Sequence, residues 1–367
     1  MRVVQLLPEL NEGGVERGVV DLNREFIRHG IDNIVISSGG RLASEIEKDG
    51  GIHITFDIKS KNIITAFLRV LQLKKILKEL KPDILHVRSR VPAWLVYFAN
   101  KSLKIKVVST VHGFNSVSLY SKIMTKADKI ICGSQFMIEH IIKNYQAPKK
   151  KIYLVPRGID EEYFNEQDFD ESYIENLINK HELKNKIVLS QIARITHWKD
   201  QETTIKSIAI IKEKIPNIKL LLVGSYSEDR ESYYSSLVKH IKDSSLEENV
   251  IFVGFTQKIK EILSITDINI SSSSKPETFG RANVEGMFLG VPLIATKIGA
   301  TSDYIIEGKT GFFFESKNYN NLSEKIIKSI NTDFDKEYIK HFVKKNFTLN
   351  SMVEKNIKIY KELLKEI

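Results

Sequence analysis

The segment KPETFGRANVEGM, residues 275–287, holds two carboxylates eight positions apart, Glu277 and Glu285. Phe279 and Gly280 lie between them and directly precede a stretch whose pattern predicts a helix. The first amides of a helix have no partner within the helix, so they would attract an anion such as a phosphate. A carboxylate accepts two hydrogen bonds and suits vicinal hydroxyls. A phosphate held between two diols is the pattern of a nucleotide sugar.

A second group of candidates is cationic. Arg194 and Lys199 flank a loop after a predicted strand that ends at Ser190. The guanidinium offers a planar fork and the ammonium a point charge, which together could neutralise a diphosphate leaving group. Taken alone, such a pair is more often a solvated surface; its order in the chain with the two glutamates favours the functional interpretation.

Glycines follow the first predicted strand. Gly13 and Gly14 open a helix there, and their missing β-carbons would let a diphosphate approach the backbone. A plain strand-to-helix turn is the alternative. The pattern is not G-x-G-x-x-G, which counts against an ordinary dinucleotide-binding fold.

Two histidines and two arginines end later strands of the first half. His112 follows a strand that ends at Val111, and His86 ends another, followed by Arg88 and Arg90. A lone histidine in such a place is more often structural, and for His86 a satisfied core imidazole is as good an interpretation as a site role. Arg88 and Arg90 could contact an acidic acceptor, beside His86.

These residues need a scaffold of parallel strands. Short apolar runs alternate with helical patterns along the whole chain, which predicts α/β sheets covered on both faces. The connector at residues 156–160 breaks the rhythm and divides it into two similar α/β domains, 1–158 and 159–345. Ligands of such sheets bind at the carboxyl ends of the strands, so the cleft between the domains is the expected site. The elements expected are strands at 3–7, 34–37, 84–87, 107–111, 129–132, 152–155, 187–190, 219–223, 249–253, 268–270 and 292–295, with helices at about 63–80, 92–102, 134–145, 200–214, 229–243, 257–265 and 281–289.

Composition fits a soluble two-domain protein. The chain has 367 residues, 42% hydrophobic and 28% charged, too many for one ordinary core. The single Cys132 cannot form an internal disulfide and is expected in the core of a protein kept in a reducing compartment. The apolar run at the N-terminus is too short for a signal peptide, and no run approaches the roughly 18 residues of a membrane span. We therefore expect a cytoplasmic protein whose membrane contact, if any, is peripheral.

The positive charge is uneven. The net charge is +9, and residues 1–160 hold 26 Lys and Arg against 15 Asp and Glu, so the whole surplus lies in the first half. Residues 67–81 form a basic amphipathic helical pattern. The ordinary explanation for this basic pattern is a solvated face. The functional explanation is contact with anionic lipid at the inner face of the cytoplasmic membrane, or with an anionic acceptor. Nucleic acid is not expected, because no basic motif is interleaved with aromatics.

Four segments together resemble the retaining GT-B glycosyltransferases of family 4. The stretch from Glu277 to Glu285 resembles the family's E-x7-E signature. The other three matches are Gly13–Glu16 after Pro8, similar to the N-terminal glycine loop, Val155–Asp160, similar to the interdomain VPNGVD segment, and Arg194–Asp200, similar to the R-x4-KG element. They occur in register and cover nearly the whole chain.

The resemblance implies a GT-B fold of two Rossmann-like domains, the first completed by a C-terminal helix at about 349–367. It implies a hexosyltransferase that moves a sugar from a nucleotide-diphosphate sugar to a sugar- or lipid-linked acceptor in cell-envelope glycolipid, lipopolysaccharide or polysaccharide synthesis, without a cofactor or metal. The catalytic residues would be His112, Glu277, Arg194 and Lys199. The donor would contact Gly13, Gly14, Arg194, Lys199, Glu277, Phe279, Gly280 and Glu285; the acceptor would contact His86, Arg88 and Arg90.

Two alternatives stay open at this level. One is a non-catalytic protein that binds sugar nucleotides, and the other is a GT-B epimerase or inverting enzyme. Transfer from a labelled donor separates the first from a transferase, and the anomeric configuration of the product decides the second.

Overall fold

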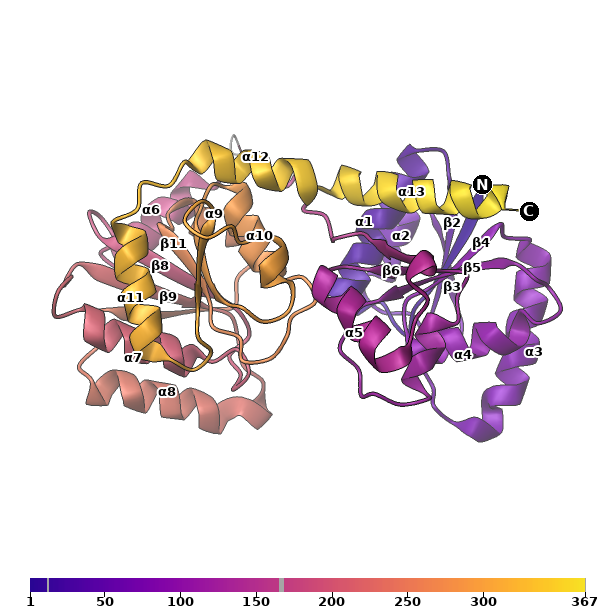
Figure 1. Ribbon diagram of the computed structural model, residues 1–367, viewed down its shortest axis with the longest axis horizontal. Helices are drawn as coiled ribbons and strands as arrows, with labels where there is room; N and C mark the ends of the chain where they lie inside the picture. Colours follow the sequence, from indigo (N-terminus) through magenta and orange to yellow (C-terminus); the bar gives the residue numbers. More distant parts are fainter. Residues whose placement is uncertain (12, 165–167, 367) are drawn as a thin grey trace. The chain divides into compact units, whose positions relative to one another are not determined.

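The computed structural model describes residues 1–11, 13–164 and 168–366, and divides the chain into two compact units. Unit 1 comprises Met1–Gly158 and Thr348–Ile367, and unit 2 comprises Ile159–Phe347. Each unit has its own parallel sheet (Figure 1). The predicted class, two α/β domains with parallel sheets, is confirmed.

Unit 1 is built on seven parallel strands in the order β3-β2-β1-β4-β5-β6-β7. The inner strands are almost wholly buried, because helices cover both faces of the sheet. Its elements are β1 (Arg2–Leu6), α1 (Gly14–Arg28), β2 (Asp32–Ser37), α2 (Ala43–Lys48), β3 (Ile52–Thr55), α3 (Ile63–Leu80), β4 (Ile84–Val87), α4 (Arg90–Ala99), β5 (Lys106–Val111), β6 (Lys129–Cys132), α5 (Gln135–Tyr145), β7 (Ile152–Leu154) and α13 (Leu349–Lys365).

The last helix of the chain belongs to unit 1. The hydroxyl of Thr348 accepts a hydrogen bond from the amide of Ser351 and caps α13. Val353 and Tyr360 of α13 are fully buried, in one cluster with Phe26 of α1. Burial of this apolar face is what holds the C-terminal helix on the N-terminal sheet.

Unit 2 carries six parallel strands in the order β10-β9-β8-β11-β12-β13. Its elements are α6 (Glu171–Lys180), β8 (Ile187–Ile192), α7 (Gln201–Ile211), β9 (Ile218–Val223), α8 (Glu231–Asp243), β10 (Val250–Gly254), α9 (Ile259–Ser264), β11 (Ile268–Ser271), α10 (Arg281–Phe288), β12 (Leu293–Thr296), β13 (Gly311–Phe314), α11 (Tyr319–Ile330) and α12 (Lys336–Asn346). The edge strands β3 and β13 are not among the strands expected from the sequence. β3 is short and half-exposed, so its apolar signal is weak.

Both sheets reverse their strand order once. The reversal lies between β1 and β4 in unit 1, and between β8 and β11 in unit 2. Ligands of open parallel sheets bind at the carboxyl ends of the strands beside such a reversal. The loops that leave β1, β4, β8 and β11 at these positions carry most of the residues that the sequence singles out.

Candidate functional site

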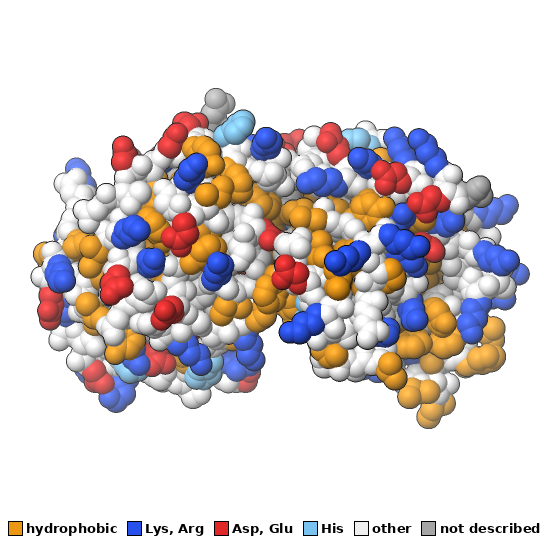
Figure 2. Space-filling view, viewed as in Figure 1, with side chains coloured by type: hydrophobic (Ala, Val, Ile, Leu, Met, Phe, Trp, Pro, Cys, Tyr) orange, Lys and Arg blue, Asp and Glu red, His pale blue; other side chains and the backbone are white. Residues whose placement is uncertain are grey.

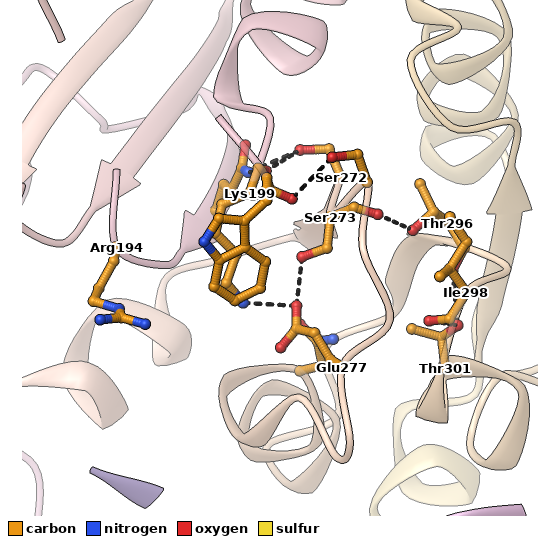
Figure 3. A network of polar contacts seen from close by, with 12 residues as sticks. Arg194, Lys199, Ser272, Ser273, Glu277, Thr296, Ile298 and Thr301 are labelled. Atoms are coloured by element: carbon orange, nitrogen blue, oxygen red, sulfur yellow. Dashed lines mark hydrogen bonds and ion pairs between the residues drawn. The ribbon is translucent and has the colours of Figure 1, made fainter. Parts of the chain in front are cut away.

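In unit 2, the loops after β8 and β11 bring together a lysine, a serine and a glutamate. The ammonium of Lys199 lies 2.6 Å from Oε1 of Glu277, and the hydroxyl of Ser273 donates to the same oxygen (Figure 3). Both charged side chains are about 15% exposed, so the pair lies at the rim of the protein and solvent screens it only partly. Since Oε1 receives both contacts, Oε2 is the oxygen left for a ligand hydroxyl.

A second set of hydrogen bonds fixes the backbone beneath this pair. The carbonyl of Lys199 accepts from the hydroxyl of Ser272 and from the side chain of Gln191, each at 2.9 Å. The amide of Ser274 donates to the carbonyl of Trp198 at 2.8 Å, and the Trp198 ring lies 4.6 Å from the Lys199 ammonium. The two loops are therefore tied together through the main chain, which preorganises the charged side chains.

The turn that presents Glu277 depends on two glycines in the left-handed region. Gly299 has φ of 76°, and a β-carbon there would lie 2.4 Å from the carbonyl oxygen of Glu277. Gly280 has φ of 73° and ends the turn just before α10. The amide of Asn283 donates to the carbonyl of Gly280. The sequence predicts open amides at the start of this helix, but the amide of Asn283 is already used within the first turn of α10.

Glu285 is nearly buried in α10. Oε1 of its carboxylate lies 2.7 Å from Nε of Arg281, one turn earlier, whose side chain is 54% exposed. Arg281 therefore covers this acid from the solvent side. Both glutamates of the segment are matched by a cation, Lys199 for one and Arg281 for the other.

Two predicted donor contacts are placed differently from the rest. Arg194 is exposed and lies apart from the Lys199–Glu277 pair in Figure 3. Phe279 is 3% exposed and packs in the core with Phe347. The Phe279 ring therefore packs in the core beside the turn, and the contact of this residue with a donor stays a prediction.

In unit 1, an arginine lies over the glycine loop. A β-carbon on Gly14 would lie 2.3 Å from Nη1 of Arg157. Nη2 of the same guanidinium lies 3.3 Å from Nδ1 of His112. Arg157 follows β7, and His112 follows β5. The sequence pattern indicated this segment only as a connector, so the position of Arg157 beside a histidine and a glycine loop is new information from the structure.

The contact with Arg157 defines the proton position on His112. A guanidinium only donates, so Nδ1 accepts and the proton of the neutral ring lies on Nε2. Burial, with the nearby charges of Arg157 and Arg88, lowers the pKa of His112 well below its ordinary value, which keeps the ring neutral. Within the described chain, Nε2 is buried and has no hydrogen-bond partner.

His86 takes a different position. Its Nε2 contacts the Thr110 hydroxyl at 2.7 Å, its Nδ1 contacts the Tyr360 hydroxyl, and the ring is fully buried. Burial, followed by the charges of Arg88 and His112, lowers its pKa well below the ordinary value. The structure therefore favours the alternative for His86, a satisfied core imidazole, and its contact with an acceptor stays a prediction.

The two arginines after β4 also differ. Arg88 is 6% exposed, and its guanidinium donates to Gln5 at 2.5 Å; burial lowers its pKa to about 10. Arg90 donates to the Ser121 hydroxyl and lies over the Tyr120 ring. Both are held by neutral partners, and Arg90 is the more accessible of the two.

Other features bear on cofactors and location. In residues 1–11, 13–164 and 168–366, no three His, Cys, Asp or Glu side chains are grouped to hold a metal ion. Cys132 is buried, and burial raises the pKa of its thiol to about 12, as suits a core residue. None of the described helices combines the length and apolar composition that a membrane span requires.

Two family models cover most of the chain. The model described as "Glycosyl transferases group 1" matches residues 174–346, and the model described as "Glycosyltransferase Family 4" matches residues 12–163. The first covers most of unit 2, including Lys199, Glu277 and Glu285, and the second covers Gly13, Gly14 and His112 of unit 1.

Individual proteins agree with these models. A glycosyltransferase of solved structure from Rickettsia africae superposes with a TM-score of 0.91 and 30% identity, over 100% of this chain and 99% of the other. The capsular polysaccharide biosynthesis glycosyltransferase CapM of Staphylococcus aureus is 28% identical over 93% of both chains. HepE from Anabaena, crystallised with UDP, shares the fold at 20% identity, with a TM-score of 0.86 over 99% of this chain and 100% of that one. Two further curated relatives, each 27% identical, are matched over only 64% and 60% of their own length.

Proposed function

The chain belongs to the GT-B glycosyltransferases of family 4, and from this premise we propose that it moves a hexose from a nucleotide-diphosphate sugar to an acceptor hydroxyl with retention of the anomeric configuration. We place the reaction in the synthesis of a cell-envelope glycolipid, lipopolysaccharide or polysaccharide. The capsular polysaccharide enzyme CapM, similar over nearly the whole chain, supports that setting.

The observation that carries the proposal is the preorganised pair in unit 2. Lys199 is held against Glu277 by loops fixed through Ser272 and Gln191. The ammonium would stabilise the leaving diphosphate, where negative charge grows in the transition state. Glu277 would accept a hydrogen bond from a hydroxyl of the transferred sugar through its second oxygen, Oε2. Glu285, inside α10, would hold the ribose diol.

The sugar nucleotide must take over part of the existing ion pair between Lys199 and Glu277. An ammonium has three N–H groups, so Lys199 can donate to a phosphate oxygen while it keeps one hydrogen bond to Glu277. The amides at the start of α10 and the exposed guanidinium of Arg194 would add positive potential beside it. Arg194, which is unconstrained by the pair, is free to move onto the diphosphate.

Unit 1 would supply a neutral donor and the glycine loop. His112, protonated on Nε2, would donate to a sugar hydroxyl near the reacting carbon, and Gly13 and Gly14 would let a phosphate approach the backbone. With no side chain placed as a covalent nucleophile in this proposal, the acceptor hydroxyl would attack from the face that the diphosphate leaves. The departing phosphate oxygen would take the proton of the acceptor hydroxyl, so no further base is needed.

This scheme neutralises the diphosphate with Lys199, Arg194 and helix amides, and we propose that no metal is needed. Transfer activity should therefore survive dialysis against EDTA. Loss of activity that Mg²⁺ or Mn²⁺ restores would reject this part of the proposal.

Two experiments test the function itself. A thermal-shift screen with UDP-, GDP-, ADP- and CMP-linked sugars should show stabilisation by one base class, because a ligand that binds only the folded state raises the melting temperature. The anomeric configuration of the product, read by NMR, should match that of the donor. Stabilisation without transfer to any membrane or polysaccharide extract would favour a binding protein, and inversion would exclude the retaining mechanism.

A further inference from the structure

The first two turns of α3 expose large apolar side chains to solvent. Ile63 and Ile64 are 86% and 88% exposed, and Phe67 and Leu68 are 69% and 60% exposed. We call these four residues the α3 tip. Single exposed apolar residues are ordinary on a protein surface, but four within six positions are not.

The tip is firmly built. Asn62 caps the helix by accepting from the amide of Ile64 at 2.9 Å. The buried guanidinium of Arg69 donates to the carbonyls of Ser60 and Asn62, which fixes the segment that enters the helix. Leu73 and Leu77 are buried in the core and Val70, Ile76 and Leu80 pack partly buried against it, whereas the first turns of α3 keep their apolar side chains exposed. The cap and Arg69 fix the start of the helix, so its exposed apolar side chains belong to an ordered segment.

Basic side chains flank the tip along the chain. Lys59 and Lys61 precede it, and Lys75 and Lys78 follow it on α3, all four exposed. Figure 2 shows hydrophobic side chains gathered at one end of α3 with basic side chains along the neighbouring edge of unit 1. The acidic groups nearby are fewer: Glu9 pairs with Lys59 at 3.0 Å, Asp57 lies 3.8 Å from Nε of Arg69, and Glu79 lies on the last turn of α3. The local charge is therefore positive.

A second apolar element lies at the same edge of the sheet. α3 begins after β3, and the segment 113–120 begins after β5, so both start at the carboxyl ends of parallel strands. Within that segment Val117 is 58% exposed and Leu119 is 84% exposed. His112, at the same strand ends, directly precedes it.

We propose that the α3 tip, with Val117 and Leu119, inserts into the surface of an anionic lipid bilayer. Apolar side chains that enter the boundary of the acyl chains, ringed by lysines that meet lipid phosphates, are the pattern of interfacial binding. A second copy of this chain fits less well, because its own lysines would meet these lysines as like charges. The sequence favoured residues 67–81 for this contact; the structure moves its apolar part toward the start of the helix, since Leu73 and Leu77 are buried.

The membrane surface also narrows the class of acceptor. Because it lies at the strand ends that carry His112, it would bring the catalytic edge of unit 1 to a bilayer, and the acceptor would be lipid-linked. This second step rests on the proposed transferase function, whereas binding of lipid by the α3 tip does not.

Flotation of the full chain with vesicles tests the surface directly. Vesicles of phosphatidylcholine with 30% phosphatidylglycerol (about one charge in three lipids) should carry the protein at low salt, and pure phosphatidylcholine vesicles should carry much less. The double variant Phe67→Ser/Leu68→Ser should lower the bound fraction by at least about tenfold, since two partly inserted side chains are lost. Phe255→Ser is the matched control, because Phe255 is equally exposed, at 72%, but belongs to unit 2.

A second measurement does not depend on loss of binding. The variant Phe67→Trp should shift its emission to the blue when anionic vesicles are added, and Phe255→Trp should not. Absence of binding at low salt, equal loss in Phe255→Ser, or a dimer in analytical ultracentrifugation that Phe67→Ser/Leu68→Ser dissolves would each overturn the proposal. If the protein binds vesicles but never transfers sugar, the surface stands and the transferase function fails; if it transfers sugar only to soluble acceptors, the lipid-linked acceptor fails.

Discussion

The two units treat charge in opposite ways. In unit 2 each acid of the site has a cation, Glu277 with Lys199 at 2.6 Å and Glu285 with Arg281 at 2.7 Å. In unit 1 the buried guanidinium of Arg88 is held by the neutral side chains of Gln5 and Thr110. At these positions the acids of unit 2 are matched by cations, whereas the buried Arg88 of unit 1 lies among neutral groups.

This difference determines what a ligand must do in each unit. In the proposed function, a sugar nucleotide bound to unit 2 would exchange partners with an ion pair, so its specificity would come from geometry that already exists. In unit 1 burial lowers the pKa values of His86 and His112 well below the ordinary value, helped by the charge of Arg88 at both rings and by that of Arg157 at His112. The imidazoles of His86 and His112 are therefore neutral hydrogen-bonding groups rather than acids.

The largest effect is expected from removal of one member of the charged pair. Glu277→Gln and Lys199→Met should each lower kcat by about 10²–10³-fold, because each removes a preorganised contact to the transition state. The double variant should cost about as much as the worse single variant, since the two residues act together. Activity is measured as transfer of label from a sugar nucleotide to extract.

Lys275→Met is the control for this pair, because Lys275 is exposed two residues before Glu277. It should retain full activity. If both pair variants and the control keep full activity, the pair of Lys199 and Glu277 does not contribute to catalysis, and the contrast between the two units loses its functional meaning.

The next largest effect concerns the two glycine sites and appears in stability. Gly299→Ala should lower the free energy of unfolding by about 2–4 kcal/mol, because its β-carbon would meet the main chain of Glu277 at a positive φ. Gly14→Ala should change it by less than about 1 kcal/mol, since the atom it meets is the end of the Arg157 side chain, which can move. Urea denaturation measures both.

Gly308→Ala separates strain from collision. Gly308 has φ of 76°, but a β-carbon there meets nothing within 4 Å. Its cost should be that of the left-handed conformation alone, about 1–2 kcal/mol. Equal losses for Gly299→Ala and Gly308→Ala would show that the contact with Glu277 is not rigid.

The sequence predicted the charged pair of unit 2 but not the contacts of the histidines in unit 1. Lys199 and Glu277 could be matched because each stands in a motif after an apolar strand, and parallel strands bring such loops to one edge. The role of Arg157 could not be found this way, because its contact with His112 joins the ends of β7 and β5 and has no local spacing. Arg88 and His86 look the same in sequence as exposed site residues, and only packing against α13, far along the chain, shows that His86 is closed by Tyr360.

A third prediction tests how Arg157 positions His112. Arg157→Leu removes the donor to Nδ1, so the ring should no longer be confined to the Nε2–H tautomer, and kcat should fall by about tenfold. Arg157→Lys keeps a cationic donor and should restore part of the activity. Two-dimensional ¹⁵N–¹H spectra of the histidine rings report the tautomer.

His86 is the internal control in those spectra, since Thr110 and Tyr360 hold both of its ring nitrogens. Its signals should be the same in the wild type and in Arg157→Leu. An unchanged His112 signal together with lost activity would mean that Arg157 acts on the ligand rather than through the histidine.

The smallest effect is a pH dependence of stability in unit 1. The unfolded chain protonates its histidines as the pH falls below about 6.5, whereas His86 and His112 stay neutral in the folded state to a much lower pH. The folded state then binds fewer protons than the unfolded state. Its free energy of unfolding should fall below pH 6.5 by up to about 1.4 kcal/mol per pH unit for each ring, and should be flat in this respect above it.

The variant Trp198→Phe leaves Trp94 of unit 1 as the single tryptophan, so its fluorescence reports the urea transition of that unit. In this background, His112→Asn should reduce the stability difference between pH 7.5 and pH 5.5 by about 1 kcal/mol, the contribution of one ring. His341→Gln, an exposed histidine of unit 2, should leave the difference unchanged. A wild-type transition independent of pH would mean that the rings can accept protons in the folded state, and the contrast between a charge-balanced unit and one that excludes further positive charge would then be lost.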